Sequence, residues 1–289
     1  MHIRLIQVPY DSAQRGARMG YGPEYFVQQG VDQALRAHGW TVAVEIIEAQ
    51  RPFRAEIYTA FELCQQIAQR VRTAKEQEAL PLVLSGNCNS SLGTLAGLDP
   101  HHLGIIWFDA HGDFNTPETT TGGFLDGMGL ATATGHSWTN MVKSIPGFAP
   151  IPDNRVLIVG VRQLDDGEQE LLAQSQVALV RGELIRASGL QESLTKPLIK
   201  LRSHISRIYL HIDLDVLDTE VGRANAYAEP GGLSVQQMEQ AITLIARQFV
   251  IAGVAFTAYD PSCDLDGGIL QAGIHLMEHV VREIEQRSQ

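Results

Sequence analysis

Runs of hydrophobic, mostly β-branched residues recur along the whole chain and predict seven buried strands. Several of these runs are apolar at nearly every position, which is typical of strands that helices cover on both faces. The predicted strands span residues 3–8, 42–47, 80–84, 103–108, 156–161, 208–216 and 251–256.

Segments with helical periodicity lie between these strands at residues 55–76, 166–174 and 234–246, and a last one lies at 280–286. Alternating strands and helices favour a mainly parallel sheet, because a crossover helix returns the chain to the same end of the sheet. The predicted fold is therefore a three-layer α-β-α arrangement of the α/β class. Since no change in composition marks a linker, we expect one domain over residues 1–289.

Two long polar segments, at residues 116–137 and 219–232, do not fit the alternation. Each follows a predicted strand that ends in carboxylates. Ligands of parallel sheets bind beyond the carboxyl ends of the strands. Both segments are therefore predicted to be loops around one binding site.

Composition narrows the range of partners. The chain has 22 Lys and Arg against 33 Asp and Glu, and its formal charge of −11 disfavours nucleic acid and anionic membranes. No apolar run approaches the roughly 20 residues of a membrane helix, and the N-terminus does not resemble a signal peptide, so we expect a cytoplasmic protein. The three cysteines are widely spaced, which indicates neither a disulfide framework nor a structural zinc site.

Side chains that bind metals gather at the ends of two predicted strands. Asp109, His111 and Asp113 follow one strand at every second position, and Asp213 and Asp215 end another with the same spacing. Side chains at this spacing on an extended chain project to one side. Because unpaired buried carboxylates are costly, a divalent cation is indicated. Five candidate ligands exceed the need of one ion and predict two ions that share carboxylates.

A third strand end adds Cys88 as a candidate ligand. A small buried thiol after a strand is also an ordinary core residue, so spacing alone leaves both interpretations open. An isolated Asp-x-Asp, such as Asp213 and Asp215, can cap a helix. Its combination with the cluster at residues 109–113 favours metal binding instead. The histidines interpreted as structural or surface residues are His101, His102, His136 and His211.

These motifs resemble those of the arginase (ureohydrolase) family, which includes arginase, agmatinase and formimidoylglutamase. The resemblance extends from the Tyr-Gly-Pro at residues 21–23 to the Pro-Gly-Gly-Leu at 230–233, and its most specific motifs lie at 109–117 and 213–218. It implies a three-layer α/β fold and a centre of two Mn²⁺ ions per chain. It also implies hydrolysis of a guanidino or amidino C–N bond in a small molecule.

The resemblance assigns roles to matching positions. The positions that match metal ligands are Cys88, Asp109, His111, Asp113, Asp213 and Asp215. At the first of these the family usually has histidine. A thiolate can replace an imidazole on a divalent ion, and a similar branch that hydrolyses N-hydroxyarginine carries cysteine there. Asp113 is also expected to hold the attacking hydroxide by a hydrogen bond.

Two other positions depart from the family. Asp126 stands where the family has its proton-shuttle histidine, and an aspartate donates well near neutrality only when burial raises its pKa. A metal-bound water is the alternative proton donor. Ala258 stands where a family glutamate anchors the substrate guanidinium. The missing anchor favours a less basic group, such as an N-hydroxyguanidine or an amidine.

The part of the site that holds an α-amino acid is partly kept. Asn115 matches a contact to the substrate carboxylate, and Asp165 matches the acid that receives the α-amino group. The alternatives are a turn residue for Asn115 and a helix cap for Asp165. Gly122 replaces a serine contact.

The predicted function is therefore a binuclear manganese hydrolase for a substrate of the N-hydroxyarginine or arginine type, with a urea-type product and an amine. Because three functional positions differ from the family, a non-catalytic or regulatory homologue is the alternative. An Asp-x-Asp glycosyltransferase would leave the cluster at residues 109–113 unexplained. The family forms trimers or hexamers, but no long tail follows the last predicted helix, so a homo-oligomer and a monomer both stay open.

Overall fold

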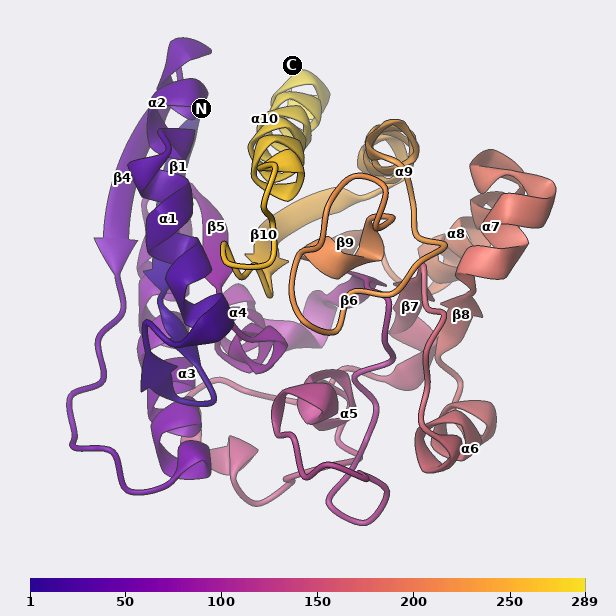
Figure 1. The fold of residues 1–289 in the computed structure, drawn as a ribbon, viewed down its shortest axis with the longest axis horizontal. Coiled ribbons are helices and arrows are strands. Elements are labelled where there is room, and N and C mark those ends of the chain that lie inside the picture. The colour runs from indigo at the N-terminus through magenta and orange to yellow at the C-terminus, as the bar shows by residue number, and fades with distance from the viewer. Residues whose placement is uncertain (289) are drawn as a thin grey trace.

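An eight-stranded parallel sheet forms the centre of the protein, seen here in a computed structural model that describes residues 1–288 (Figure 1). The strands lie in the order β4-β1-β5-β10-β9-β6-β7-β8, and every neighbouring pair is parallel. They are β1 (His2–Val8), β4 (Thr41–Ile46), β5 (Leu80–Ser85), β6 (Gly104–Phe108), β7 (Val156–Val159), β8 (Ala178–Val180), β9 (Arg207–Asp213) and β10 (Val250–Thr257). A separate hairpin joins β2 (Tyr10–Asp11) to β3 (Gln14–Arg15).

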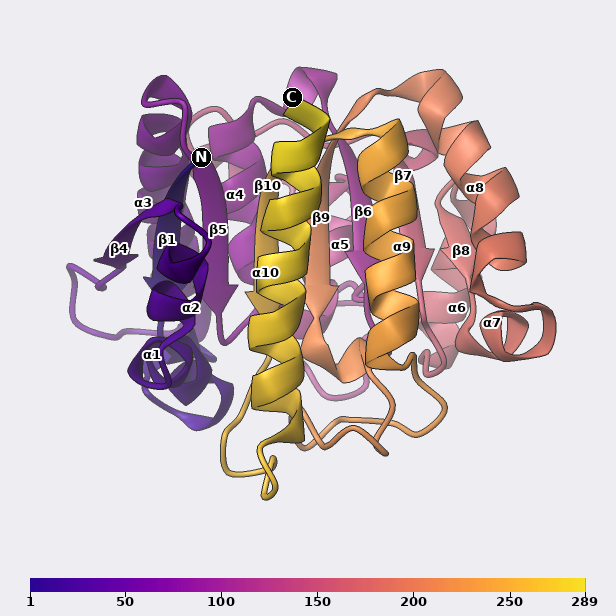
Figure 2. The same cartoon turned by 90° about the horizontal axis from the view of Figure 1, so that it is seen from above.

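Helices cover both faces of this sheet (Figure 2). On one face lie α1 (Gly22–Gln28), α2 (Val31–Ala37), α7 (Gly182–Ser188), α8 (Leu190–His204), α9 (Val235–Gln248) and α10 (Gly268–Ser288). On the other lie α3 (Glu56–Glu76), α4 (Ser91–Leu98), α5 (Gly129–Ala133) and α6 (Asp166–Gln174). Among residues 1–288, no helix has the length and apolar composition of a membrane span.

Two apolar cores lie between these helices and the sheet. Successive residues of a strand point to opposite faces, so Leu5 and Phe108 belong to one core while Ile6 and Trp107 belong to the other. This double burial explains why the strands are apolar at almost every position. The predicted three-layer α/β fold is confirmed.

All seven predicted strands are present, and the differences have local causes. The strand predicted to reach residue 216 ends at Asp213, because a 3-10 turn follows at Leu214–Val216. The sequence pattern missed β8, which is only three residues long. The predicted helix at 280–286 is part of the longer α10. The segment 116–137 is only partly a loop, since it contains α5, whereas 219–232 forms neither helix nor strand.

The order of the strands decides where the candidate site forms. Strands β5, β10, β9 and β6 are consecutive in the sheet, although other elements separate them along the chain. Their carboxyl ends lie along one edge, which for β5 and β9 is the lower edge in Figure 2. Residues that follow these four strands therefore meet in space.

Helices α3 and α4 pack closely because Gly93 of α4 has no side chain. A Cβ atom at this position would lie 2.5 Å from the carbonyl oxygen of Cys64 and 2.8 Å from Cβ of Ile67, both in α3. These distances are too short for van der Waals contact. The backbones of the two helices would have to move apart to admit a methyl group.

We expect Gly93→Ala to lower the free energy of unfolding by about 1–3 kcal/mol, because overpacking outweighs the better helix propensity of alanine. Urea denaturation measures the change. Gly122→Ala is the control, since a Cβ atom there meets no atom within 4 Å. The control should stay within about 0.5 kcal/mol of the wild type. Equal losses in the two variants would contradict the packing argument.

Candidate metal centre and substrate pocket

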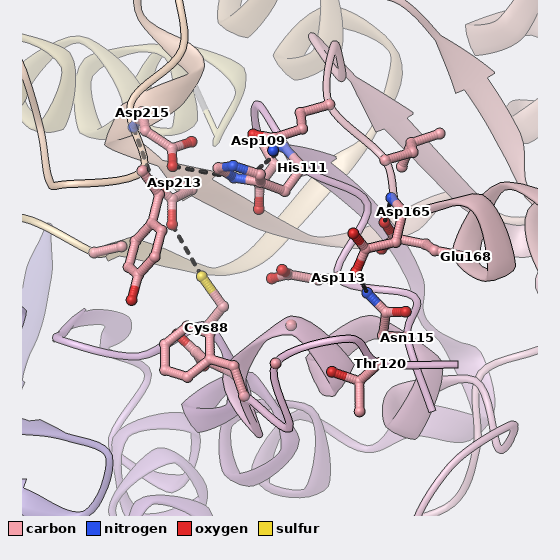
Figure 3. Close-up of a pocket in the computed structure, with 18 of the residues that line it drawn as sticks. Cys88, Asp109, His111, Asp113, Asn115, Thr120, Asp165, Glu168, Asp213 and Asp215 are labelled. Carbon is pink, nitrogen blue, oxygen red and sulfur yellow. Dashed lines mark hydrogen bonds and ion pairs between the residues drawn. The ribbon is translucent and has the colours of Figure 1, made fainter. Parts of the chain in front are cut away.

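The carboxyl ends of β5, β6, β9 and β10 border a pocket of about 280 Å³. Its wall contains every residue for which the sequence predicts a role in metal binding, catalysis or substrate binding. Figure 3 labels all of them except Asp126. These residues are Cys88, Asp109, His111, Asp113, Asn115, Asp126, Asp165, Asp213 and Asp215. The structure therefore brings all nine predicted residues together.

The residues after β6 turn sharply into the pocket. Asp109 accepts hydrogen bonds from the backbone N–H of His111 at 2.7 Å and from Nε1 of Trp107 at 3.0 Å. Asp113 has a φ of 50°, in the left-handed region, and its carbonyl oxygen accepts the N–H groups of Leu130 and Ala131. Turns, and not an extended strand, direct this cluster toward one point, so the predicted extended geometry at 109–113 is wrong.

The end of β9 is also a turn. Oδ1 of Asp213 accepts the N–H of Asp215 at 2.9 Å, which fixes the 3-10 turn, and Oδ1 of Asp215 accepts the N–H of Ala110 at 3.1 Å. Nδ1 of His111 lies 3.3 Å from carboxylate oxygens of both Asp109 and Asp215. Direct contacts thus join the residues that follow β6 to those that follow β9.

Burial makes this concentration of carboxylates unfavourable without a cation. It raises the pKa of Asp109, Asp113 and Asp213, and neighbouring carboxylates raise these pKa values further. Burial also acts to raise the pKa of Asp215, but the charge and hydrogen bond of His111 outweigh it and lower this pKa to about 2. Divalent cations would relieve the repulsion among the ionised groups.

Asp113 supplies a second sign that the site fits a cation. Its Oδ2 atom is buried and has no hydrogen-bond partner among the described residues. A buried carboxylate oxygen without a partner is costly unless a cation or a proton satisfies it. The donor set, made of carboxylates with imidazole and thiol groups, suits a divalent metal ion.

Cys88 points its thiol into this cluster. Sγ donates a hydrogen bond to Oδ2 of Asp213 at 3.0 Å and lies 3.2 Å from Oγ1 of Thr257 (Figure 3). Burial raises the pKa of the thiol, and Asp213 and Asp113 add to this effect. Cys88 belongs to the apolar core, and its sulfur atom also lies within 4.8 Å of candidate ligand atoms of Asp109, His211 and Asp213.

Two sets of side chains in the described part of the chain have their ligand atoms within 4.8 Å of one another. One set is Asp109, His111 and Asp215, and the other is Cys88, Asp109, His211 and Asp213. Asp109 belongs to both sets and could bridge two ions. The sequence analysis did not assign His211 to metal binding, although its spacing of two residues before Asp213 on β9 was a signal.

Asn115 and Asp165 form the wall of the pocket away from Cys88 (Figure 3). Nδ2 of Asn115 donates to Oδ2 of Asp165 at 3.0 Å, and its Oδ1 accepts from Oγ1 of Thr119 at 2.9 Å. Asp165 is also the N-cap residue of α6. The helix-cap interpretation of Asp165 is therefore compatible with a role in substrate binding, since the same residue caps α6 and lines the pocket.

Asp126 is buried at the end of the pocket near β5. Oδ1 accepts the N–H of Asn89 at 2.8 Å, and Oδ2 accepts from Nδ2 of Asn87 at 2.9 Å. Burial raises the pKa of Asp126 to about 7, although these hydrogen bonds act to lower it. The elevated pKa that proton donation near neutrality requires is therefore present.

Glu168 and Asn225 are among the pocket residues that the sequence analysis did not predict. Glu168 is buried, and its carboxylate accepts the N–H groups of Phe114 at 2.7 Å and Asp165 at 3.2 Å. Its place three residues after the helix cap was a capping-box signal. Asn225 donates from Nδ2 to the carbonyl oxygen of Ala258 at 2.9 Å and to Oδ2 of Asp215 at 3.3 Å. No sequence pattern marked Asn225.

The sequence matches the model of the arginase family over residues 1–284. The chain belongs to the arginase family. It is 31% identical to the arginase of Bacillus subtilis (strain 168) over 289 residues, which covers 96% of this chain and 97% of that protein. It is 27% identical to Bacillus caldovelox arginase, with 95% and 96% covered. A crystal structure of Bacillus subtilis arginase, 28% identical, has a TM-score of 0.89 over 97% of this chain and 98% of that chain.

The pKa of Glu168 gives a prediction for stability against pH. Burial raises this pKa from 4.5 to about 7, so the folded protein binds the Glu168 proton more tightly than the unfolded chain. The stability that the protonated carboxyl contributes is present below pH 4.5 and is lost as the pH rises to about 7. Glu168→Gln cannot ionise and should therefore gain about 1–3 kcal/mol relative to the wild type over this interval.

Urea denaturation of the metal-free protein at several pH values measures this difference. Glu170→Gln, which changes an exposed glutamate in the same helix, is the control. We expect no such pH-dependent difference for the control. A constant difference between Glu168→Gln and the wild type from pH 4.5 to 8 would show that Glu168 ionises normally.

Proposed function

We propose that the protein hydrolyses a guanidino or amidino C–N bond in an amino-acid-like small molecule, of the N-hydroxyarginine or arginine type, with two divalent metal ions. The enzyme class is a C–N hydrolase of linear amidines, because the arginases to which the chain is similar are ureohydrolases. The observation that carries the proposal is the sharing of Asp109 by two sets of candidate ligands in one pocket.

Six residues would hold the two ions. They are Cys88, Asp109, His111, Asp113, Asp213 and Asp215. Mn²⁺ fits the carboxylates that predominate in this set. When bound, such ions polarise the substrate and lower the pKa of water. Asp113, with its unpartnered Oδ2, can also accept a hydrogen bond from the attacking group.

Asn115 and Asp165 would orient the substrate. Nδ2 of Asn115 can donate to a substrate carboxylate, and the carboxylate of Asp165 can accept from an α-ammonium group. Because both residues lie on the wall away from Cys88, a substrate held by them would extend its reactive carbon toward the carboxylate cluster. Such positioning lowers the entropic part of the barrier.

Asp126 would donate a proton to the departing amine. A general acid works only in its protonated form, and Asp126 is protonated below its pKa of about 7. An amine departs readily only after its nitrogen has been protonated. The buried carboxyl thus fits this role near neutral pH.

Asp126→Asn should lower turnover by roughly 10²–10⁴-fold and leave the metal content unchanged. It should also abolish the fall in wild-type turnover above pH 7. Steady-state kinetics at several pH values and elemental analysis measure these effects. Asp153→Asn, which changes an acid that contacts His136 outside the pocket, is the control. Unchanged turnover in Asp126→Asn would exclude this residue as the proton donor.

Ala258 would set the preference for the reactive group. It contributes only a methyl group to the pocket, where a carboxylate would be needed to anchor a guanidinium. We therefore expect N-hydroxyarginine or an amidine to be hydrolysed with a higher kcat/KM than arginine. Ala258→Glu should raise kcat/KM for arginine about 10- to 100-fold, since hydrogen bonds to charged groups contribute about 1.5–3 kcal/mol.

A panel of hydroxyarginine, arginine, agmatine and formimino substrates, assayed with the Mn²⁺-loaded wild type, tests both the activity and the preference. Ala258→Gln is the matched control, because it adds a side chain of similar size without the charge. If both variants raised kcat/KM for arginine equally, the effect would come from the size of the side chain and not from its charge. No turnover of any substrate by a protein with two bound ions would favour a non-catalytic homologue.

A further inference from the structure

We propose that the two metal positions differ chemically, and that His211 and Cys88 make the deeper one selective for Zn²⁺ or Co²⁺ over Mn²⁺. The inference rests on the proposed metal centre and adds a ligand, His211, to it. The deeper position is the set Cys88, Asp109, His211 and Asp213, and the outer position is the set Asp109, His111 and Asp215.

The two positions differ in depth. Every side chain of the deeper set is buried, and His211 is fully inaccessible. In the outer set, the His111 side chain is 25% exposed and lines the pocket. The deeper position is therefore the more buried of the two, although Cys88, Asp109 and Asp213 also line the pocket and only His211 does not.

The ring of His211 is held in one orientation. It stacks on Trp107 with ring centroids 3.5 Å apart and an angle of 11° between the planes. Nδ1 lies 3.0 Å from Oγ of Ser91 and 3.2 Å from the hydroxyl oxygen of Tyr209. A histidine that binds metal through one nitrogen usually donates its other N–H to a neighbour. Here the two hydroxyls can accept from Nδ1, so Nε2, which among residues 1–288 hydrogen-bonds only to the Thr257 hydroxyl, could bind a metal.

Nε2 of His211 faces the same point as the other ligands of the deeper set. The hydroxyl of Thr257 lies 3.2 Å from Nε2, 3.2 Å from Sγ of Cys88 and 3.2 Å from Oδ2 of Asp213. One small group thus contacts three of the four candidate ligands. The fourth, Asp109, is oriented by Nε1 of Trp107, the same indole on which His211 stacks.

The ligand types differ between the two positions. Zn²⁺ and Co²⁺ bind thiolate and imidazole well, whereas Mn²⁺ prefers oxygen ligands. The general order of affinity of divalent ions also places Zn²⁺ and Co²⁺ above Mn²⁺. Only the deeper position combines sulfur with nitrogen. The deeper set has four side chains, the number of ligands in a structural zinc site, whereas the outer set has three. Asp113, which the proposed centre also includes, belongs to neither set.

Titration of the metal-free, full-length protein with Co²⁺ under anaerobic conditions tests the ligand set by absorption spectroscopy. We expect the first equivalent to produce a thiolate-to-cobalt charge-transfer band and strong visible bands of a four-coordinate ion. Cys88→Ser should lose the charge-transfer band. Cys64→Ser, which changes another buried thiol outside both sets, should keep it. A wild-type spectrum without this band would overturn the proposal.

His211→Gln should keep the charge-transfer band but weaken binding of the first ion by more than about 100-fold. This exceeds the 10- to 100-fold loss typical of residues that only contact a ligand. Thr257→Val tests whether His211 binds the metal itself or only positions the hydroxyl of Thr257. If His211 acted only through the Thr257 hydroxyl, both variants would lose affinity equally, and the assignment of His211 as a ligand would fail.

A competition experiment tests selectivity without any variant. Metal-free wild type is incubated with equal excesses of Zn²⁺ and Mn²⁺, and elemental analysis follows removal of unbound metal. We expect zinc to be retained in the deeper position of every chain. The outer position, which lacks the thiol, should discriminate less between the two metals. Retention of two Mn²⁺ ions would overturn the selectivity.

These readouts measure binding and not turnover, so they separate this inference from the proposed function. A thiolate-cobalt band in a protein that hydrolyses no substrate would support the deeper site and count against the hydrolase. Hydrolysis by a protein that shows no such band would support the hydrolase and overturn the deeper site.

Discussion

The concentration of buried negative charge at the carboxyl ends of four neighbouring strands is the constraint on which the site depends. The carboxylates of Asp109, Asp113, Asp213 and Asp215 are each less than one-tenth exposed. Burying ionised groups this closely costs several kcal/mol per group unless cations compensate. Backbone N–H groups and His111 offset part of this charge, and the proposed cations would offset more. Metal binding would then be coupled to the stability of this edge of the sheet.

Arg162 supports the same edge from behind the ligands. Its guanidinium is partly buried and donates to the carbonyl oxygens of Asp215, Leu217 and Glu229. These bonds tie the turn after β9 to the segment 219–232, from which Asn225 reaches back to Asp215 and Ala258. The irregular segment thus has a fixed position although it contains neither helix nor strand. Side chains satisfy several of its backbone N–H groups, since Asp218 accepts from Gly231 and Gly232.

The sequence was sufficient to predict the layers and most of the site, for physical reasons that differ. Strands buried on both faces leave long apolar runs, so seven of eight sheet strands could be recognised, whereas β8 is too short to leave one. Polar residues at the ends of apolar runs, such as Asp109 and Asp213, could be recognised as candidate ligands because parallel strands end at a common edge.

What could not be predicted depends on tertiary contacts. Local hydrophobic periodicity does not reveal the order of the strands in the sheet. That order brings Ala258, after β10, beside the candidate metal ligands. The turns that aim Asp113 and Asp215 depend on hydrogen bonds to α5 and to Ala110. His211 was assigned a structural role because a histidine inside an apolar strand usually has one. Only its approach to Cys88 and Asp213 through Thr257 indicates more.

The departures at Asp126 and Ala258 are consistent with one another. Relative to the family pattern, Asp126 replaces a histidine and Ala258 replaces a glutamate. The pocket thus gains an acid at position 126 and loses one at position 258. Asp126 is buried with a pKa of about 7 and is therefore partly neutral near that pH. Besides the candidate metal ligands, the acids that line the pocket are Asp126, Asp165 and Glu168, and none of them stands at the position of Ala258. Under the proposed function, a less basic reactive group would avoid the cost of leaving a desolvated cation unpaired, and Asn115 and Asp165 would hold a zwitterionic end.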